Sequence, residues 1–395
     1  MDIKKIMKDY FLDLDAAARD PRRKVAWCTS VGPAEILRAA GYEVFFPENH
    51  GAMLGATRTC MDTIPNANAI GYSPDICSYL TSDIGAYLKK LTPLTQAYGI
   101  ASIPKPDLLV YNTNQCKDVM HWFEFYAREW NVPIFGIHPP THIPEVLPEH
   151  VDDVVRQFQT LIGLIEKLNN KKFDWERLKQ CVALSREATD LWGELLKCAA
   201  HKPAPFSFFD GTILMGPIVV LRGTEIARDF YKSHLEFMKG QIRQGVSAVP
   251  NEQSRVYWEG MPIWGRLRSL SELFKRNKTA VVASTYCNSW IFSDFDAQNP
   301  LPSMAKAYLQ IFINRNDAYK EKYIEKMVHD FGIDGVVFHD AKTCPNNSNS
   351  QYNLPGRLRA KGIPTVVING DLCDLRCFSD EQSATVIEAF LETIA

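Results

Sequence analysis

The sequence predicts an α/β protein with two doubly wound parallel-sheet domains and a helical segment between them. Short apolar runs alternate with helix-like stretches near both ends of the chain, as expected for parallel strands joined by crossover helices. Between these parts, residues 148–245 contain long amphipathic stretches instead. The 395 residues, 46% of them hydrophobic, suffice for two or three domains with buried cores.

The elements are expected in four consecutive parts. Residues 1–22 carry charges throughout and predict an amphipathic N-terminal helix. The first α/β domain, 23–147, has expected strands at 24–28, 42–46, 107–111 and 133–137, and helices at 33–41 and 117–130. After the helical segment, the second α/β domain, 246–395, has expected strands at 255–261, 279–285, 335–339 and 365–369, and a closing helix at 381–395. Both domains are thus expected to be Rossmann-like.

Composition excludes several functional classes. A net charge of −2 and a pI near 6.5 give no basic footprint for nucleic acid. No run approaches the roughly eighteen apolar residues of a membrane span. The charged N-terminus lacks the apolar stretch of a secretory signal, so we expect a cytoplasmic protein. No GxxxxGK[ST] motif occurs, and the chain is not expected to hydrolyse ATP by itself through a P-loop.

Ten cysteines are many for a cytoplasmic chain, where disulfides are rare. They leave metal binding, catalysis or plain burial, and no CxxC pair indicates a zinc ribbon or a ferredoxin-type run. Cys181 and Cys198 fall inside the helical segment and are expected to be small buried hydrophobes. Five others follow strand-like runs, near the edge where open α/β sheets place their sites: Cys28, Cys77, Cys116, Cys287 and Cys344.

The stretch GYSPDICSYL, residues 71–80, places Cys77 where a strand-like run ends and a helix is expected to begin. Ser73 and Asp75 are candidate caps, and Pro74 suits a first helical turn. A thiolate at a helix N-terminus is stabilised by unpaired N–H groups and the helix dipole. This position favours a metal ligand or a nucleophile without deciding between them.

Seven fragments in order carry a resemblance: AWCTSVGPAEILRAAGYEVFFPENHGA, GYSPDICSY, KPDLLVYNTNQCKDVMHWFE, WEGMPIW, STYCNSW, HDAKTCPNNSNSQY and NGDLCDLRCFS. Together they resemble the iron–sulfur catalytic subunits of the benzoyl-CoA reductase and (R)-2-hydroxyacyl-CoA dehydratase family, of the 2-hydroxyglutaryl-CoA dehydratase D-component type. The resemblance runs from about residue 24 to the C-terminus.

The resemblance implies that Cys77, Cys116 and Cys344 hold one [4Fe–4S] cluster between the two α/β domains. A separate ATP-dependent iron–sulfur activator would supply a low-potential electron, and the acyl-CoA thioester would be reduced to a ketyl radical. Dehydration of an (R)-2-hydroxyacyl-CoA to an enoyl-CoA is the leading expectation. Reductive dearomatisation of an aromatic acyl-CoA is the alternative. A homologous second subunit, or a second copy of the chain, is the expected partner.

Two further residues match catalytic positions of the family. Ser30, or Thr29 beside it, would hydrogen-bond a group at the open iron; the alternative is a cap for the next helix. Glu48, just beyond a buried strand, would have a raised pKa and transfer protons. The alternative for Glu48 is a loop carboxylate facing water, and His50 is a possible assistant.

Other residues have more than one interpretation. Cys28 and Cys287 are either extra cluster ligands, which would allow a larger cluster, or buried thiols lining the site. Cys60 has no assigned role. Cys373 and Cys377 are spaced for a shared metal, but Asp371, Asp374 and Arg376 around them favour a structural or subunit-contact loop.

Basic residues should line the CoA entrance, because CoA carries phosphates; the candidates are Arg222, Arg266, Arg268 and Lys342. Trp258, Trp264 and Trp290 are expected in the core rather than in an acyl pocket. Two other functional classes are disfavoured. The retained Ser30, Glu48 and cysteines argue against a non-catalytic partner subunit, and the missing signal sequence and the ten cysteines argue against a two-domain solute-binding protein.

Overall fold

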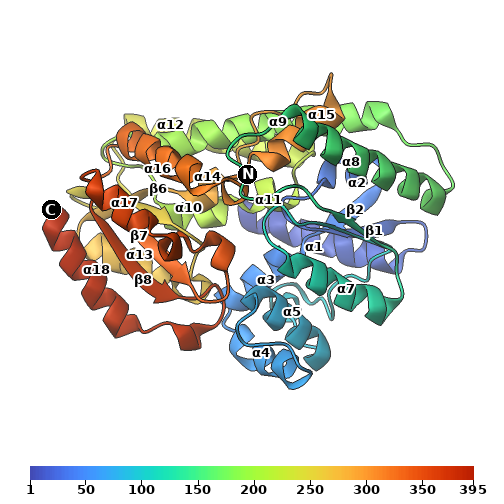
Figure 1. Ribbon diagram of the computed structural model, residues 1–395, viewed down its shortest axis with the longest axis horizontal. Helices are drawn as coiled ribbons and strands as arrows, with labels where there is room; N and C mark the ends of the chain where they lie inside the picture. The colour runs from blue at the N-terminus through green and yellow to red at the C-terminus, as the bar shows by residue number, and fades with distance from the viewer.

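The computed structural model describes residues 1–395, apart from the side chain of Gln351, and contains two four-stranded sheets (Figure 1). The strands are β1 (Lys24–Cys28), β2 (Tyr42–Phe45), β3 (Leu108–Asn112), β4 (Ile134–Ile137), β5 (Ser254–Glu259), β6 (Thr279–Ser284), β7 (Gly335–Ala341) and β8 (Thr365–Gly370). Every neighbouring pair is parallel. The predicted fold class is therefore confirmed.

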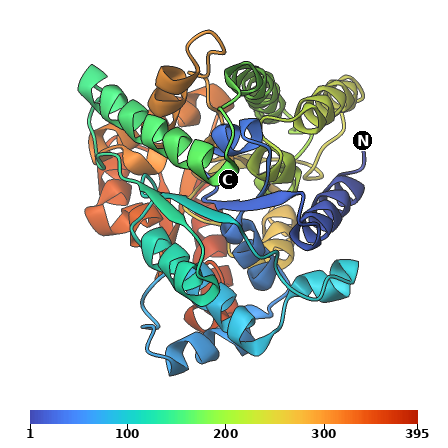
Figure 2. The same cartoon turned by 90° about the vertical axis from the view of Figure 1, so that its right-hand side faces the viewer.

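The strands form where short apolar runs are rich in β-branched and aromatic residues. All residues of β3, β5 and β6 are buried, as is typical of parallel strands covered on both faces. Figure 2 looks at the first sheet and shows α8 on one side and α7 on the other. All eight predicted strands occur, with ends shifted by at most two residues.

The helices of the first part are α1 (Ile3–Arg19), α2 (Ala34–Ala39), α3 (Pro47–Ala56), α4 (Cys60–Ala69), α5 (Ser78–Lys89), α6 (Pro93–Tyr98) and α7 (Asp118–Trp130). The middle part holds α8 (Pro148–Asn169), α9 (Trp175–Lys197), η1 (Cys198–Ala200), α10 (Phe208–Leu214), α11 (Gly216–Val220) and α12 (Glu225–Arg243). The last part holds η2 (Trp264–Arg266), α13 (Leu267–Arg276), α14 (Thr285–Asn288), α15 (Pro300–Leu309), η3 (Phe312–Asn314), α16 (Asp317–Phe331), η4 (Pro345–Asn347), η5 (Asn349–Tyr352), α17 (Leu354–Ala360), η6 (Leu375–Cys377) and α18 (Asp380–Ile394).

The long helices of the middle part bridge the two sheets. α9 and α12 pack on each other and run along one side of the molecule past both halves (Figure 1). The N-terminal α1 covers the first sheet near β1 and β2, where Phe11 and Leu14 are buried. Among the described residues, we find no helix with the length and apolar character needed to cross a membrane.

The strand order positions the site. The first sheet runs β2-β1-β3-β4 and the second β6-β5-β7-β8, so the same permutation occurs twice. The order reverses between β1 and β3 and again between β5 and β7. In open α/β sheets, ligands bind beyond the carboxyl ends of the strands at such a switch point.

The segment before Cys77 differs from the prediction. No strand forms there, because α4 occupies residues 60–69 and a turn with Gly71 at φ 106° follows it. α5 begins at Ser78, and Cys77 itself is the N-cap residue. Ser73 and Asp75 therefore do not cap this helix; the Ser73 hydroxyl instead accepts a hydrogen bond from the Asp75 N–H at 3.1 Å.

Candidate active site

One pocket between the two sheets brings the five predicted site residues together. Ser30 follows β1, Glu48 lies in the first turn of α3, Cys77 caps α5, Cys116 follows β3 and Cys344 follows β7. The side chains that line the pocket are Ser30, Glu48, Cys77, Tyr79, Gln115, Cys116, Asp118, Val119, Trp122, Met261, Tyr286, Trp290, Ile313, Cys344 and Leu372. The pocket thus lies at the switch points of both sheets.

Hydrogen bonds tie the three cysteine-bearing loops to one another. The Cys77 N–H donates to Asp118 Oδ2 at 3.1 Å, which joins the first loop to the residues after Cys116. Ser78 N–H donates to Thr343 Oγ1 at 3.0 Å, which joins it to the residue before Cys344. The third link runs from Asn346 Nδ2 to the Gln115 carbonyl oxygen at 3.2 Å. The backbone positions of the three thiols are therefore mutually fixed.

Asp371 anchors this arrangement from the loop after β8. Its Oδ2 accepts the Thr343 hydroxyl at 2.6 Å and the Thr343 N–H at 2.9 Å. Its Oδ1 accepts the N–H groups of Cys373 and Asp374. The structural-loop interpretation of this segment is correct, and the loop also supports the link between Thr343 and Ser78.

Burial raises the pKa of all three thiols. For Cys77 the pKa is raised further by the neighbouring charges of Cys116 and Cys344; the pKa of Cys116 rises to about 12. The expected stabilisation by helix-start N–H groups is present but smaller than the effect of burial. The N–H groups that lower the thiol pKa values are those of Leu80 for Cys77, Asp118 and Val119 for Cys116, and Asn347 for Cys344.

This donor set suits an iron–sulfur cluster better than a single ion. Among the described residues, no group of three His, Cys, Asp or Glu side chains is close enough to hold one metal ion. The thiolates of a four-iron cluster bind different irons and therefore stand further apart than the ligands of one ion. Three half-buried thiols, each with a backbone N–H that hydrogen-bonds to its sulfur, provide soft ligands. The residues present fit such a group.

Glu48 presents one free carboxylate oxygen in the pocket. Its Oε1 accepts hydrogen bonds from the Ser30 N–H at 2.9 Å and from Gln115 Nε2 at 2.8 Å. Within the described part of the chain, the buried Oε2 has no hydrogen-bond partner. Burial raises the pKa of Glu48, and the hydrogen bonds from Ser30 and Gln115 only partly offset this rise. The water-facing loop interpretation of Glu48 is wrong, since the residue is 8% exposed and helical.

A buried ion pair holds the Ser30 loop. Arg222 Nε donates to Glu35 Oε1 at 2.9 Å, with both side chains fully buried. Arg222 also donates to the carbonyl oxygens of Ser30 and Gly32, each at 3.2 Å, while the Tyr308 hydroxyl donates to Glu35 at 2.5 Å. The prediction of Arg222 at a CoA entrance is therefore wrong: the guanidinium is buried and positions the loop.

The neighbours of Ser30 and Glu48 have other contacts. Ser30 is not a helix cap, because Pro33 occupies the N-cap position of α2. The Thr29 hydroxyl accepts the Asn112 N–H at 3.0 Å, so of the two hydroxyls Ser30 lines the pocket. Both ring nitrogens of His50 are engaged, Nδ1 with Asp83 at 2.5 Å and Nε2 with Thr92 at 2.9 Å. His50 thus supports α3 and α5 rather than the pocket.

Tyr79 and Tyr286, which sequence reasoning missed, form an aromatic group with Trp264, which was expected in the core but is only half-buried. Trp264 Nε1 donates to the Tyr79 hydroxyl, and the Trp264 and Tyr286 rings pack edge to face at 5.9 Å. Tyr79 also hydrogen-bonds with Tyr286, whose pKa is raised above its ordinary value by burial. The fragment STYC contained Tyr286, but only its position after β6 could have indicated a site residue.

A second missed group lies behind the Cys344 loop. Glu259, the last residue of β5, accepts hydrogen bonds from Asn349 Nδ2 at 2.5 Å and from the Thr285 hydroxyl. Asn349 Oδ1 accepts from Lys320 Nζ at 2.9 Å. Burial raises the pKa of Glu259 to about 7. This network fastens the segment that follows Cys344 to β5 and α16.

The remaining cysteines lie outside the pocket lining. Cys28 is buried in β1 against Gly32, and Cys287 is buried in α14 near Gly211, so neither is the site-lining thiol that was predicted. Cys60 Sγ donates to the Cys373 carbonyl oxygen at 3.0 Å. Cys181 and Cys198 are buried in or beside α9, as predicted.

The other predicted basic residues form ion pairs with acidic side chains. Arg266 pairs with Asp380, Arg268 with Glu272 and Lys342 with Asp75. Trp258 is fully buried as predicted, but Trp290, also buried, contributes to the pocket.

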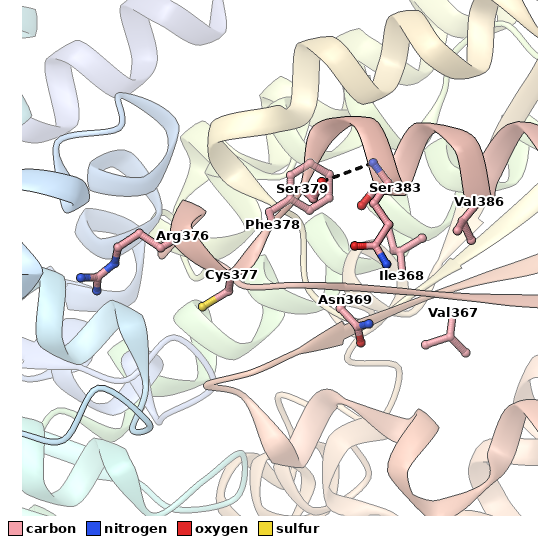
Figure 3. Close-up of a pocket in the computed structure, with 10 residues that line it drawn as sticks. Val367, Ile368, Asn369, Arg376, Cys377, Phe378, Ser379, Ser383 and Val386 are labelled. Atoms are coloured by element: carbon pink, nitrogen blue, oxygen red, sulfur yellow. Dashed lines mark hydrogen bonds between the residues drawn. The ribbon is translucent and has the colours of Figure 1, made fainter.

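A separate pocket runs from the end of β8 to the start of α18 and contains Cys377 and Asn369 (Figure 3). The dashed line in Figure 3 joins Ser383 to Ser379, whose carbonyl oxygen accepts the Ser383 N–H at 3.0 Å. None of the five predicted site residues lines this pocket. It therefore plays no part in the site built around Glu48 and the three thiols.

The fold and the pocket together define a two-sheet α/β protein with a pocket between the sheets that is lined by three thiols, Ser30 and Glu48. Comparison with known families gives this class a name. The sequence model of the family described as 2-hydroxyglutaryl-CoA dehydratase, D-component, matches residues 29–394, and the chain belongs to this family.

Similar proteins agree over nearly the whole length. The alpha subunit of lactoyl-CoA dehydratase from Anaerotignum propionicum is 28% identical, covering 96% of this chain and 93% of its own length. The (R)-2-hydroxyisocaproyl-CoA dehydratase alpha subunit of Clostridioides difficile is 28% identical, covering 95% and 91%. A benzoyl-CoA reductase subunit of Thauera aromatica is 26% identical, covering 88% and 83%. The predicted family is confirmed, as is the prediction of an enzyme of dehydratase or reductase kind.

Proposed function

We propose that this chain is the [4Fe–4S]-carrying subunit of an (R)-2-hydroxyacyl-CoA dehydratase, with Cys77, Cys116 and Cys344 as the cluster ligands. The observation that carries the proposal is the single pocket lined by these three thiols, Ser30 and Glu48. Such a cluster would supply the low-potential one-electron chemistry needed to reduce an acyl-CoA thioester. A separate ATP-dependent activator provides the electron, and a homologous second subunit completes the enzyme.

In this proposal Glu48 donates a proton to the departing α-hydroxyl group. A carboxyl group with a raised pKa is protonated more often near neutral pH and can donate its proton. Because Oε1 is held by Ser30 and Gln115, the group that reaches the substrate is Oε2. Transfer of this proton to the leaving hydroxide releases water. The Ser30 hydroxyl orients the same part of the substrate.

Residues 23–147 and 246–395 are proposed as the two domains that enclose the substrate. Ser30, Glu48 and two of the thiols come from the first, and Met261, Tyr286 and Cys344 from the second. Most of this lining is apolar or already hydrogen-bonded, so it offers water few partners. A desolvated pocket strengthens every electrostatic interaction in it.

A benzoyl-CoA reductase-type subunit is the second candidate. The observation in its favour is the aromatic lining, with Trp122, Trp290 and Tyr286 in the same pocket. The test is anaerobic assay of the complete enzyme with partner subunit, activator, ATP and reductant. The proposal predicts enoyl-CoA from (R)-2-hydroxyacyl-CoA without net electron consumption. Dearomatised product from benzoyl-CoA, with no dehydration, would replace it by the second candidate.

A further inference from the structure

The lining of the site pocket has an uneven distribution of charge. Two carboxylates, Glu48 and Asp118, contribute to it, but no lysine, arginine or histidine does so among the described residues. The nearest buried cation described above, Arg222, is fully engaged with Glu35 and backbone carbonyl groups. A negative charge on the acyl group would therefore have no counter-charge in the pocket.

Two aromatic residues of the pocket, Trp122 and Tyr79, have polar atoms that are already hydrogen-bonded. Trp122 Nε1 donates to Asp83 Oδ2 at 2.8 Å, so the indole presents carbon atoms to the pocket. The Tyr79 hydroxyl is already engaged by Trp264. With Trp290, Ile313 and Leu372, these side chains make up much of the apolar lining of the pocket that also contains Glu48 and the thiols. An acyl chain would find hydrocarbon contacts here and few hydrogen-bond donors.

We infer that the acyl group accepted by this site is uncharged, either aliphatic or aromatic, and carries no free carboxylate. This inference rests on the proposed function and narrows it. Burying an unpaired carboxylate beside two others is unfavourable, because its hydration is lost and like charges repel. A pocket that serves a dicarboxylic acyl group needs a cation, and this one offers none. The 2-hydroxyglutaryl group named in the family description would thus be rejected.

The test uses two thioesters of equal shape. In (R)-2-hydroxy-5-methylhexanoyl-CoA an isopropyl group replaces the free carboxylate of (R)-2-hydroxyglutaryl-CoA. With the complete enzyme, we expect kcat/KM for the uncharged substrate to exceed that for the charged one by at least about 100-fold. Ile313→Arg, which adds a cation to the lining, should narrow this ratio at least about tenfold, whereas Ile313→Leu should leave it unchanged.

Binding is measured separately, by calorimetry on the two-subunit enzyme without activator, where no turnover occurs. Tighter binding of the uncharged thioester in wild type supports the inference even if neither thioester is dehydrated, in which case only the proposed function fails. Equal or tighter binding of the glutaryl thioester in wild type overturns the inference. Dehydration of the glutaryl thioester with equal or higher kcat/KM overturns the inference and leaves the proposed function intact.

Discussion

The Ser78 N–H donates to the Thr343 hydroxyl at 3.0 Å across 265 residues of sequence. Ser78 follows Cys77 at the start of α5, and Thr343 precedes Cys344 after β7. This one bond joins a loop beside the first sheet to a loop beside the second. Since the Thr343 hydroxyl donates a hydrogen bond to Asp371 Oδ2 at 2.6 Å, its oxygen is oriented to accept the Ser78 N–H. The relation between two proposed cluster ligands is thus set by a buried threonine.

Replacement of Thr343 by valine keeps the side-chain shape and removes both hydrogen bonds. Leaving Ser78 N–H and Asp371 Oδ2 without this partner should lower the free energy of unfolding by about 1–3 kcal/mol. It should also lower the amount of iron retained after anaerobic purification. Denaturant unfolding and iron analysis measure the two effects, with Thr343→Ser as the control that keeps the hydroxyl. Wild-type iron content and stability in Thr343→Val would show that the bond does not position the loops.

Replacement of Glu48 by glutamine keeps an oxygen for the Ser30 N–H but removes the titrating proton. We expect dehydration to slow by about 10²–10⁴-fold, as for loss of a general acid, while the dissociation constant for acyl-CoA changes little. Rates and binding are measured at equal cluster content. If turnover survives with an intact cluster, Glu48 does not transfer the proton.

The buried Glu35–Arg222 pair should be required for stability and for the Ser30 loop. Arg222→Met leaves Glu35 as an uncompensated buried charge and should cost about 3–5 kcal/mol in denaturant unfolding. The double variant Arg222→Met with Glu35→Gln removes both charges and should recover part of this loss. A double variant no more stable than the single one would show that lost packing, rather than the unpaired charge, causes the destabilisation.

Glu259 should make stability depend on pH. Its pKa rises from 4.5 in the unfolded chain to about 7 in the folded protein. The folded state therefore binds the extra proton between these values, and its stability falls as pH rises through this window. The loss approaches about 3 kcal/mol as an upper bound. Denaturant unfolding at pH 5 and pH 8 should show a smaller difference in Glu259→Gln than in wild type; identical pH dependence would assign the effect elsewhere.

The fold was predictable because its signals are local. β6, with the sequence TAVVAS, is a β-branched run buried on both faces, and such runs are recognisable without knowledge of the neighbours. α4 was missed because Pro65 and two asparagines weaken its helical pattern, although tertiary packing against α5 keeps it helical. The strand expected before Cys77 does not form, because α4 and the turn at Gly71 occupy this stretch.

The site was predictable only in part. The cysteines, Ser30 and Glu48 were found through the resemblance, and the structure gathers them in one pocket. Arg222 was misplaced because its partner Glu35 lies 187 residues away, although the apolar residues 218–221 just before it could have indicated burial. Gln115 and Tyr286 follow correctly predicted strands, but many polar residues do so, and only folding selects among them.

The most direct test of the central claim is iron and acid-labile sulfide analysis with EPR on anaerobically purified protein. Wild type should contain about four irons and four sulfides per chain, and Cys77→Ala, Cys116→Ala and Cys344→Ala should each lose them. Cys181→Ala, which changes a buried thiol in α9, is the matched control and should keep the wild-type content. Absence of iron after careful reconstitution, or full iron content in all three variants, would contradict the assignment of these thiols as cluster ligands.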